Sequence, residues 1–237
     1  FNIAPVSGGV KLGLTRGVQV RDSTFTQNHG PGFWEDMSVY NTVVRGSNFT
    51  KNAGDGLFLE ISARVVVGDS VFADNPLDGI KVNNTANVKI WNNTFTGNGR
   101  TLDVVQDARR ASDRGTPGHD PRQPFPDPTM TWLLGPVTVR NNVVADTASG
   151  NCLLCVEDYS KQRSAEQIGV TADGDVYHRT SPGTPTWAVV WSRGAGNPAV
   201  FTDLASFTRT TGQEARGVLL TGADVVDAAG RPTGAFP

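Results

Sequence analysis

The five residues Thr24-Phe25-Thr26-Gln27-Asn28 open a pattern that returns three more times along the chain. The later copies are Asn48-Phe49-Thr50-Lys51-Asn52, Val71-Phe72-Ala73-Asp74-Asn75 and Thr94-Phe95-Thr96-Gly97-Asn98. From copy to copy the phenylalanine moves on by 24, 23 and 23 residues, and the asparagine keeps the same steps. A fixed period of this length predicts a solenoid in which each copy is one coil. Equivalent residues of successive coils then lie in straight rows along the molecule.

Each coil is predicted to consist of short strands. Apolar and polar residues alternate in Gly17-Val18-Gln19-Val20-Arg21 and in Asn87-Val88-Lys89-Ile90-Trp91, and this is the period of a strand. The leucine-rich consensus of another repeat of similar length is absent. These features favour a parallel β-helix, with the phenylalanines stacked inside and the asparagines hydrogen-bonded from coil to coil.

The motif Asn92-Asn93-Thr94-Phe95-Thr96-Gly97-Asn98-Gly99 resembles the repeat of right-handed parallel β-helix proteins of the pectate-lyase-like superfamily. The stretches Gly32-Phe33-Trp34-Glu35-Asp36 and Gly56-Leu57-Phe58-Leu59-Glu60-Ile61-Ser62 resemble large secreted bacterial members of this group. The resemblance covers roughly residues 9–147. It implies an all-β, right-handed solenoid, a polysaccharide or oligosaccharide as partner, and a secreted, extracellular location. It is specific for the fold and does not name a reaction.

The sequence predicts one domain of about six coils with a small C-terminal cap. Residues 1–160 hold the coils, interrupted by an insertion at about residues 108–131 that is rich in Pro, Asp, Arg and Gly. Long loops on rigid scaffolds often border functional sites, so we expect a wall or lid beside a groove. Residues 161–237 form an irregular last coil and a cap, whose short helix begins near Thr202 or Asp203. Because the first coil starts abruptly, we expect N-terminal coils or a cap to be missing.

Composition limits the classes of partner. The chain has 237 residues, 38% of them hydrophobic, which is enough for one sizeable core. A net charge of −2 gives no electrostatic footprint for nucleic acid or an anionic membrane, and no apolar run approaches the ~18 residues of a membrane span. Nothing in the sequence indicates an oligomeric state. Cys152 and Cys155 are expected to be packed thiols, with a disulfide as the alternative; a metal site would need more ligands than lie nearby.

Three rows of residues follow the glycines at positions 9, 32, 56 and 79, with Thr101 replacing glycine in the fifth coil. Side chains alternate along a strand, so the second and fourth residues after each glycine point outward. The second-position row is Lys11, Trp34, Phe58, Lys81 and Asp103, and the fourth-position row is Gly13, Asp36, Glu60, Asn83 and Val105. The third position points inward and reads Leu12, Glu35, Leu59, Val82 and Val104, in which only Glu35 is charged.

The outward rows predict a catalytic patch for glycan hydrolysis. Asp36 and Glu60 would be stacked neighbours at the strand separation of about 4.8 Å, close to the ~5–5.5 Å between the carboxyls of retaining glycosidases. Asp103 and Glu35 are the alternate catalytic carboxylates. The rings of Trp34 and Phe58 would stack on sugar, and Lys11 and Asn83 would complete the substrate-binding surface. This reaction needs no cofactor.

Other functions remain open from the residues alone. A polysaccharide lyase would use Lys81 to take a proton and Ca²⁺ to neutralise a uronate, although calcium prefers about six to eight oxygens and this patch offers fewer. The patch could instead belong to a non-catalytic carbohydrate-binding or surface-adhesion β-helix. It could also be a solvated face on which Lys81 offsets Asp36 and Glu60. We expect an enzyme, with hydrolysis ahead of elimination, and regard Glu157-Asp158-Tyr159 as a candidate extension of the groove.

Overall fold

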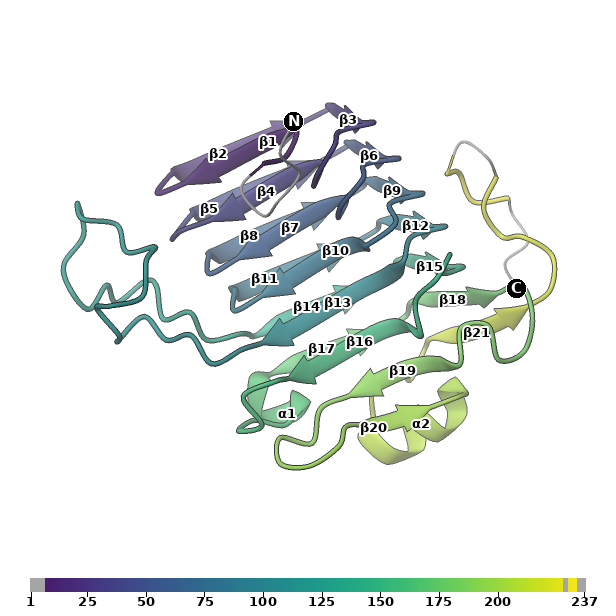
Figure 1. Cartoon of the computed structure of the whole chain (residues 1–237). Coiled ribbons are helices and arrows are strands. Elements are labelled where there is room, and N and C mark those ends of the chain that lie inside the picture. Colours follow the sequence, from purple (N-terminus) through teal and green to yellow (C-terminus); the bar gives the residue numbers. More distant parts are fainter. Residues whose placement is uncertain (1–6, 228–229, 234–237) are drawn as a thin grey trace.

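The protein is a parallel β-helix in the computed structural model, which describes residues 7–227 and 230–233 (Figure 1). The outermost residues of the predicted domain, 1–6 and 234–237, lie outside the described residues. Coils stack along one axis, and each of the first six coils adds one strand to each of three sheets. Every pairing between these strands is parallel apart from the last one in sheet A, which is antiparallel. The predicted all-β solenoid of about six coils is confirmed.

The strands of the three sheets follow one another along the solenoid. Sheet A has the order β1 (Val10–Gly13), β4 (Phe33–Asp36), β7 (Leu57–Glu60), β10 (Asp78–Asn83), β13 (Arg100–Gln106), β16 (Cys152–Asp158), β19 (Trp187–Trp191) and β20 (Ala199–Phe201). Sheet B consists of β2 (Arg16–Arg21), β5 (Tyr40–Arg45), β8 (Ala63–Gly68), β11 (Ala86–Trp91), β14 (Val137–Arg140) and β17 (Val170–Asp173). Sheet C consists of β3 (Thr24–Thr26), β6 (Asn48–Thr50), β9 (Val71–Ala73), β12 (Thr94–Thr96), β15 (Val143–Ala145), β18 (Val176–Arg179) and β21 (Val218–Thr221).

The repeated phenylalanine and asparagine form the two predicted columns. The rings of Phe25, Phe49, Phe72 and Phe95 stack with centroids 4.9, 4.8 and 5.0 Å apart. Along the column Asn28, Asn52, Asn75 and Asn98, the side-chain amide of each of the first three donates to the side-chain oxygen of the next, at 2.7, 3.0 and 2.8 Å. Buried amides need such partners, because an unpaired one loses its hydrogen bonds to water. The period in the sequence is therefore the spacing of these two columns.

Glycine lies at the start of the sheet-A strand in each of the first four coils for a steric reason. A Cβ on Gly56 would lie 2.7 Å from the Gly79 carbonyl and 2.9 Å from the Asn75 amide nitrogen. A Cβ on Gly79 would meet the Thr101 carbonyl at the same 2.7 Å. Only a residue without a side chain lets the next coil and the asparagine column approach this closely.

The irregular segment between sheet A and sheet B of the fifth coil is longer than predicted. It covers residues 107–136, because β13 ends at Gln106 and β14 begins at Val137. The segment folds back over the turns of earlier coils, at the left in Figure 1. Trp132 is fully buried and donates to the Ser38 hydroxyl at 3.2 Å, and Gly118 accepts from the same hydroxyl at 2.7 Å.

Two short helices lie toward the C-terminal end. α2 (Leu204–Thr211) begins after Asp203, whose carboxylate accepts from the Ser206 amide, as predicted for a cap in this region. It packs on β19 and β20 at the open end of the last coil. α1 (Ala165–Ile168) was not predicted, although Ser164 and Gln167 form a capping box that signals a helix start.

The two cysteines form a disulfide within β16. The prediction of packed thiols is therefore wrong, and the alternative holds. Both residues are wholly buried, and their Cα atoms are 5.8 Å apart, a separation that a disulfide can bridge.

Candidate functional site

The predicted rows exist on the outer face of sheet A. Lys11 pairs in register with Trp34, Trp34 with Phe58, Phe58 with Lys81, and Lys81 with Asp103. The fourth-position row also holds, since Asn83 pairs with Glu60 and with Val105. Thr101 takes the place of the glycine as expected, because Leu102 pairs with Ile80. The structure therefore brings the candidate residues onto one face, and their contacts decide which of them can act.

Asp36 and Glu60 are adjacent in the same row but occupied by other partners. Asp36 forms an ion pair with Lys11 at 2.9 Å and accepts from the Met37 amide at 2.7 Å. Glu60 forms an ion pair with Arg109 at 2.7 Å and accepts from the Trp34 indole at 3.1 Å. Burial raises the pKa of Glu60, and Arg109 offsets part of that rise. Lys81 reaches neither carboxylate, so the predicted pairing of Lys81 with Asp36 or Glu60 is wrong.

Trp34 does not offer a free face for sugar. Its side chain is only 4% exposed. The Lys11 ammonium lies 3.4 Å from the centre of its ring, and the Phe58 ring stacks on it with centroids 5.3 Å apart. The prediction of Trp34 as a stacking platform is wrong, because neighbouring long side chains cover the ring. Phe58 itself is half-buried.

Glu35 points into the core and is not part of the outer surface. It is fully buried, and neither of its carboxylate oxygens has a hydrogen-bond partner among the described residues. Burial raises its pKa to about 7, and the nearby Thr42 hydroxyl offsets only part of this effect. The prediction of Glu35 as an alternate catalytic residue is wrong, because its strand position sends the side chain inward between Leu12 and Leu59.

A groove of about 360 Å³ opens at the N-terminal end of the sheet-A strands, one coil further along. We call it the acid groove, and its charged and aromatic lining residues are Asp78, Lys81, Arg100, Asp103 and Tyr159. Lys81 contacts Asp78 at 3.6 Å and Asp103 at 3.7 Å. Arg100 contacts Asp103 at 3.0 Å and Glu157 at 2.9 Å. Two carboxyl groups thus flank one ammonium inside the groove.

The carboxyl groups of the acid groove hold protons more tightly than ordinary ones. The pKa of Asp78 and that of Asp103 are each raised to about 7, mainly by burial; repulsion from Asp55 adds to the rise at Asp78, and repulsion from Asp78 adds to the rise at Asp103. Asp55 lies in the preceding coil, where its carboxylate accepts from the Asp78 amide at 3.1 Å, and burial raises its pKa as well. Interacting carboxyls titrate together, so near neutrality the coupled groups Asp55, Asp78 and Asp103 share protons instead of being fully ionised.

Two exposed side chains border the acid groove. Tyr159 is 58% exposed and Leu77 is 55% exposed, and both line it. The Tyr159 hydroxyl donates to Glu157 at 3.3 Å, which fixes the ring beside Arg100. They provide the open apolar surface that the sequence assigned to Trp34 and Phe58. Glu157 and Tyr159, which we regarded as a candidate extension, lie at this site.

Asp55, Asp78 and Arg100 were missed by the sequence reading. They share one position, the residue directly before the glycine of each sheet-A strand or before Thr101. A carboxylate at this position in two successive coils is a signal that row-by-row reading could have found. The rows in the sequence analysis start at the glycine and therefore leave out the residue before it. Side-chain alternation applies within a strand and does not predict the direction of a residue at the strand's end.

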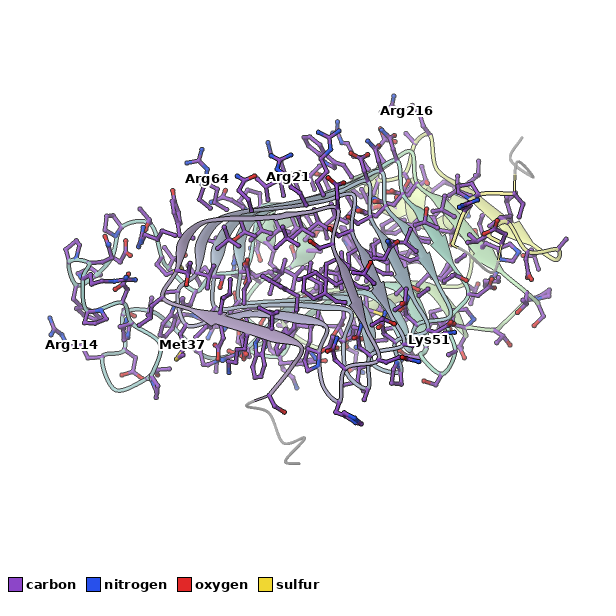
Figure 2. The ribbon with its side chains drawn as sticks, turned by 90° about the horizontal axis from the view of Figure 1, so that it is seen from above. Arg21, Met37, Lys51, Arg64, Arg114 and Arg216 are labelled. Atoms are coloured by element: carbon purple, nitrogen blue, oxygen red, sulfur yellow. A yellow bond between two sulfur atoms is a disulfide. The ribbon has the colours of Figure 1, made fainter. Side chains whose placement is uncertain are left out.

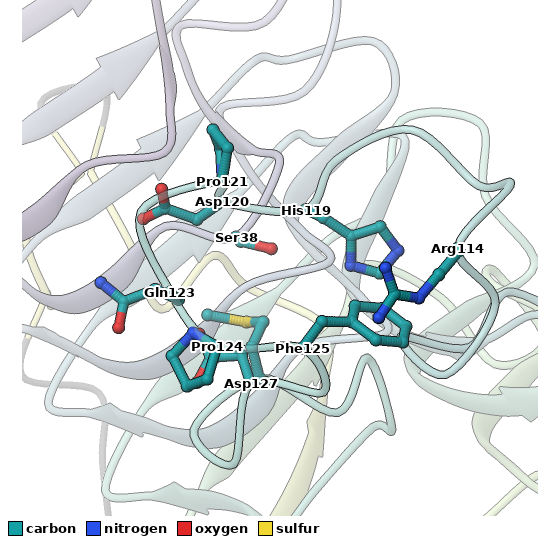
Figure 3. A pocket seen from close by; sticks show the side chains of 10 residues that line it. Ser38, Arg114, His119, Asp120, Pro121, Gln123, Pro124, Phe125 and Asp127 are labelled. Carbon is teal, nitrogen blue, oxygen red and sulfur yellow. The ribbon is translucent and has the colours of Figure 1, made fainter.

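The insertion borders the other end of these strands and encloses a pocket of its own. Arg109 at its start reaches Glu60. Further along, a pocket of about 430 Å³ contains His119, Arg114 and Phe125 at one side (Figure 3). His119 stacks on Trp132 with centroids 4.5 Å apart, and Arg114 lies 4.1 Å from the centre of the Phe125 ring. These contacts fold the insertion into a packed unit, and its role as a wall or lid beside a groove on sheet A stays a prediction.

No helix within residues 7–227 and 230–233 is long and apolar enough to cross a membrane. In the same part of the chain, no three His, Cys, Asp or Glu side chains are grouped so that they could hold a metal ion. The charged groups of the acid groove are instead balanced by Lys81 and Arg100.

Comparisons with known proteins support the fold. The chain matches the family described as "Right handed beta helix region" over residues 2–112. Among solved structures it is similar to a double mutant of the periplasmic alginate epimerase AlgG, with 17% sequence identity and a TM-score of 0.51. The similarity covers 65% of this chain and 33% of that one, so the chain spans about a third of the length of AlgG. A search of curated protein sequences finds no match. The predicted right-handed parallel β-helix is confirmed, and at this identity the likeness is one of fold.

Proposed function

We propose that the protein processes a polysaccharide by hydrolysis in the acid groove. The observation that carries the proposal is the pair Asp78 and Asp103, two buried carboxyl groups with pKa values of about 7 that flank the Lys81 ammonium in a surface groove. Glycoside hydrolysis uses two such groups, one protonated and one ionised. The similarity to a periplasmic alginate epimerase, which acts on a polysaccharide, supports the class of substrate.

The two carboxyl groups have different surroundings, which suggests their roles. Lys81 and Arg100 favour the ionised form of both groups, but only Asp103 accepts directly from Arg100, at 3.0 Å. Asp78 faces Asp55, whose negative charge favours a proton on Asp78. Asp78 would therefore donate a proton to the departing glycosidic oxygen as general acid. Asp103 would activate water or attack the sugar carbon.

Geometry is compatible with this division of labour. The nearest oxygens of the two carboxylates are separated by at most the sum of their distances to the Lys81 ammonium, 3.6 and 3.7 Å. That sum falls below the upper end of ~9.5 Å for carboxyl separations in glycosidases. Tyr159 and Leu77 would contact the flat face of a sugar at the groove edge.

The cations of the groove already balance its carboxylates. Lys81 and Arg100 are both in ion pairs with Asp78, Asp103 or Glu157. A neutral sugar unit at the cleaved bond therefore fits better than a uronate, whose charge would compete for these two cations. An exported location agrees with the disulfide between Cys152 and Cys155, since disulfides persist in oxidising compartments.

Incubation with a panel of neutral and uronic-acid polysaccharides, followed by mass spectrometry of the soluble products, tests the proposal. Hydrolysis gives fragments one water heavier than the internal repeat. Asp103→Asn should lower the rate by about 10²- to 10⁴-fold. The matched control is Asp36→Asn, the same change on the same face, at a residue paired with Lys11, and its rate should stay within about threefold.

Other outcomes would contradict the proposal. Unsaturated uronate fragments would indicate elimination, with Lys81 as base and Ca²⁺ as the cation to test. Retention of a glycan without any fragments would indicate a binding module. An equal loss of hydrolysis rate in Asp36→Asn and Asp103→Asn would indicate that the row of Asp36 and Glu60 belongs to the active site.

A further inference from the structure

The outer face of sheet B carries a second hollow, well away from the acid groove. Its volume is about 670 Å³, and it lies between the strands of coils two to four and the end of the insertion. The lining residues are Tyr40, Asn41, Thr42, Val43, Arg64, Val66, Ala86, Asn87, Lys89, Pro128, Thr129 and Thr131. Two of these residues are cationic and none is acidic. We call this site the basic hollow.

The insertion forms the wall of the basic hollow through a fixed set of contacts. Arg16 donates to the Asp127 carboxylate at 2.7 Å, and its guanidinium lies over the Tyr40 ring at 5.0 Å. These contacts hold Pro128 and Thr129 over sheet B, where they line the hollow. The hollow therefore belongs to the folded structure.

Arg64 occupies a backbone position that favours small or amide residues. In register across the coils, this position is Gly17, Asn41, Arg64 and Asn87, with φ of 76°, 66°, 63° and 56°. Glycine and asparagine adopt this left-handed conformation readily, whereas an arginine does so at a cost. Arg64 is exposed and lines the hollow, so core packing does not offset this cost. A role for the guanidinium in binding explains why an arginine is tolerated there.

Cations continue beyond the hollow along the last residues of the sheet-B strands. The in-register row there reads Arg21, Arg45, Gly68, Trp91, Arg140 and Asp173. Trp91 is 37% exposed, and the Lys89 ammonium lies 5.1 Å from the centre of its ring. Figure 2 shows Arg21, Arg64 and Arg216 along one side of the molecule, with Lys51 on the other.

The carboxylates of this face are mostly neutralised, which leaves a cationic excess. Asp69 pairs with Arg45 at 2.7 Å, Asp173 with Arg216 at 2.6 Å, and Asp127 with Arg16 at 2.7 Å. Asp22 lies at the turn after Arg21, outside the hollow. Within residues 7–227 and 230–233, Arg21, Arg64 and Lys89 form no ion pair with a carboxylate.

We propose that the basic hollow and the adjoining arginine row bind a polysaccharide that carries carboxylate or sulfate groups. Five successive sheet-B strands each carry at least one cation, at differing positions along the strand: Arg21, Arg45, Arg64, Lys89 and Arg140. Adjacent strands are about 4.8 Å apart, so these cations can meet successive acidic groups of an extended chain. The amides of Asn41 and Asn87 and the hydroxyls of Thr129 and Thr131 suit sugar hydroxyl groups, and Trp91 offers an aromatic face. This site is independent of the acid groove and would keep the protein on an acidic polymer.

Native gel electrophoresis with polygalacturonate or dextran sulfate in the gel tests the proposal, with mobility expressed relative to a polymer-free gel. The wild-type protein should be retarded by both anionic polymers and not by plain dextran. Added salt of about 0.5 M should abolish the retardation, because the screening length falls from about 10 Å at 0.1 M to about 3 Å at 1 M salt. The double variant Arg64→Glu/Lys89→Glu should bind at least about tenfold more weakly.

The matched control is Lys51→Glu/Arg209→Glu, the same charge change at exposed positions on other faces, and it should bind within about twofold of the wild type. Trp91→Ala, which alters no charge, should weaken binding about three- to fivefold. Equal losses in the two double variants would overturn the proposal by reducing it to net charge. Equal retardation by plain dextran, or tighter binding to duplex DNA than to polygalacturonate, would overturn the assignment to an acidic glycan.

Discussion

Sheet A and sheet B run along the same solenoid and differ in how they hold charge on their outer faces. On sheet A, Asp78 and Asp103 lie below 10% exposure, covered by turns and by long side chains. On sheet B, Arg21, Arg64 and Lys89 stand in solvent. Burial penalises charge and shifts protons, whereas exposure preserves charge and leaves it available to a partner. One repeat can therefore present a site suited to acid–base chemistry on one face and a site suited to electrostatic binding on another.

The largest expected effect concerns Glu35, a carboxyl group buried on the inner side of sheet A, and the way it makes stability depend on pH. Glu35 has a pKa of about 7 in the folded state against an ordinary 4.5, so folding favours its protonated form. Its contribution to stability is present below pH 4.5 and is lost as pH rises through about 7. Replacing it with an apolar residue removes this loss, which amounts to about 3 kcal/mol between pH 5 and pH 8.

Urea unfolding of Glu35→Leu and of the wild type at several pH values measures this difference. The gain in unfolding free energy over the wild type should grow with pH. The control is Asp22→Asn, which removes an exposed carboxylate on the sheet-B side and should show a difference independent of pH. A constant gain for Glu35→Leu would mean that the carboxyl is not buried in its neutral form.

The two faces should also differ in how their functions depend on pH. As pH rises above about 7, the Asp78–Asp103 pair loses its last proton, and the rate of glycan hydrolysis should fall by up to about tenfold per pH unit. Retardation by polygalacturonate should hardly change from pH 6 to pH 8, because arginine and lysine side chains in general stay charged there. Parallel pH profiles for rate and retardation would show that one site serves both functions.

Tyr159 tests whether the exposed rim of the acid groove binds sugar. Tyr159→Ala should raise KM by about fivefold and leave kcat within about twofold, since the loss of one stacking contact is worth about 1 kcal/mol. Initial rates over a range of oligosaccharide concentrations measure both constants. Trp34→Phe is a useful comparison, because Trp34 is covered on both faces, and its KM should stay the same. A larger effect on kcat than on KM for Tyr159→Ala would place the ring at the reacting bond.

The smallest expected effect lies at the row that the sequence favoured. Glu60→Gln retains the shape of a side chain that accepts from Trp34 and pairs with Arg109. We expect the hydrolysis rate to change by less than about threefold, with a loss of stability of about 1 kcal/mol from the weakened ion pair. Thermal unfolding and product analysis on the same preparation separate the two effects. A loss of rate comparable to that of Asp103→Asn would indicate that Glu60 and Asp103 act in one active site.

The period of 23 to 24 residues determined the coil, the phenylalanine and asparagine columns and the register of sheet A. These features depend on residues that repeat, because each coil makes the same contacts with the next one. For the same reason the sequence alone predicts the register of the second- and fourth-position rows, including Lys81, Asp103 and Glu60.

Tertiary structure decided which of those residues can act. A long charged side chain can reach several neighbours, and the sequence does not say which of them it pairs with. Lys81 forms ion pairs with Asp78 and Asp103. Lys11 pairs with Asp36, and Arg109 pairs with Glu60. The insertion supplies Arg109 and the wall over sheet B, and no repeat predicts where a single irregular segment folds back. Exposure likewise depends on everything that packs around a residue, which is why Trp34 is covered and Tyr159 is open. Alternation in the sequence predicts on which face of the strand a side chain lies. Whether that side chain is exposed depends on the residues that pack over it, and only the tertiary structure shows these.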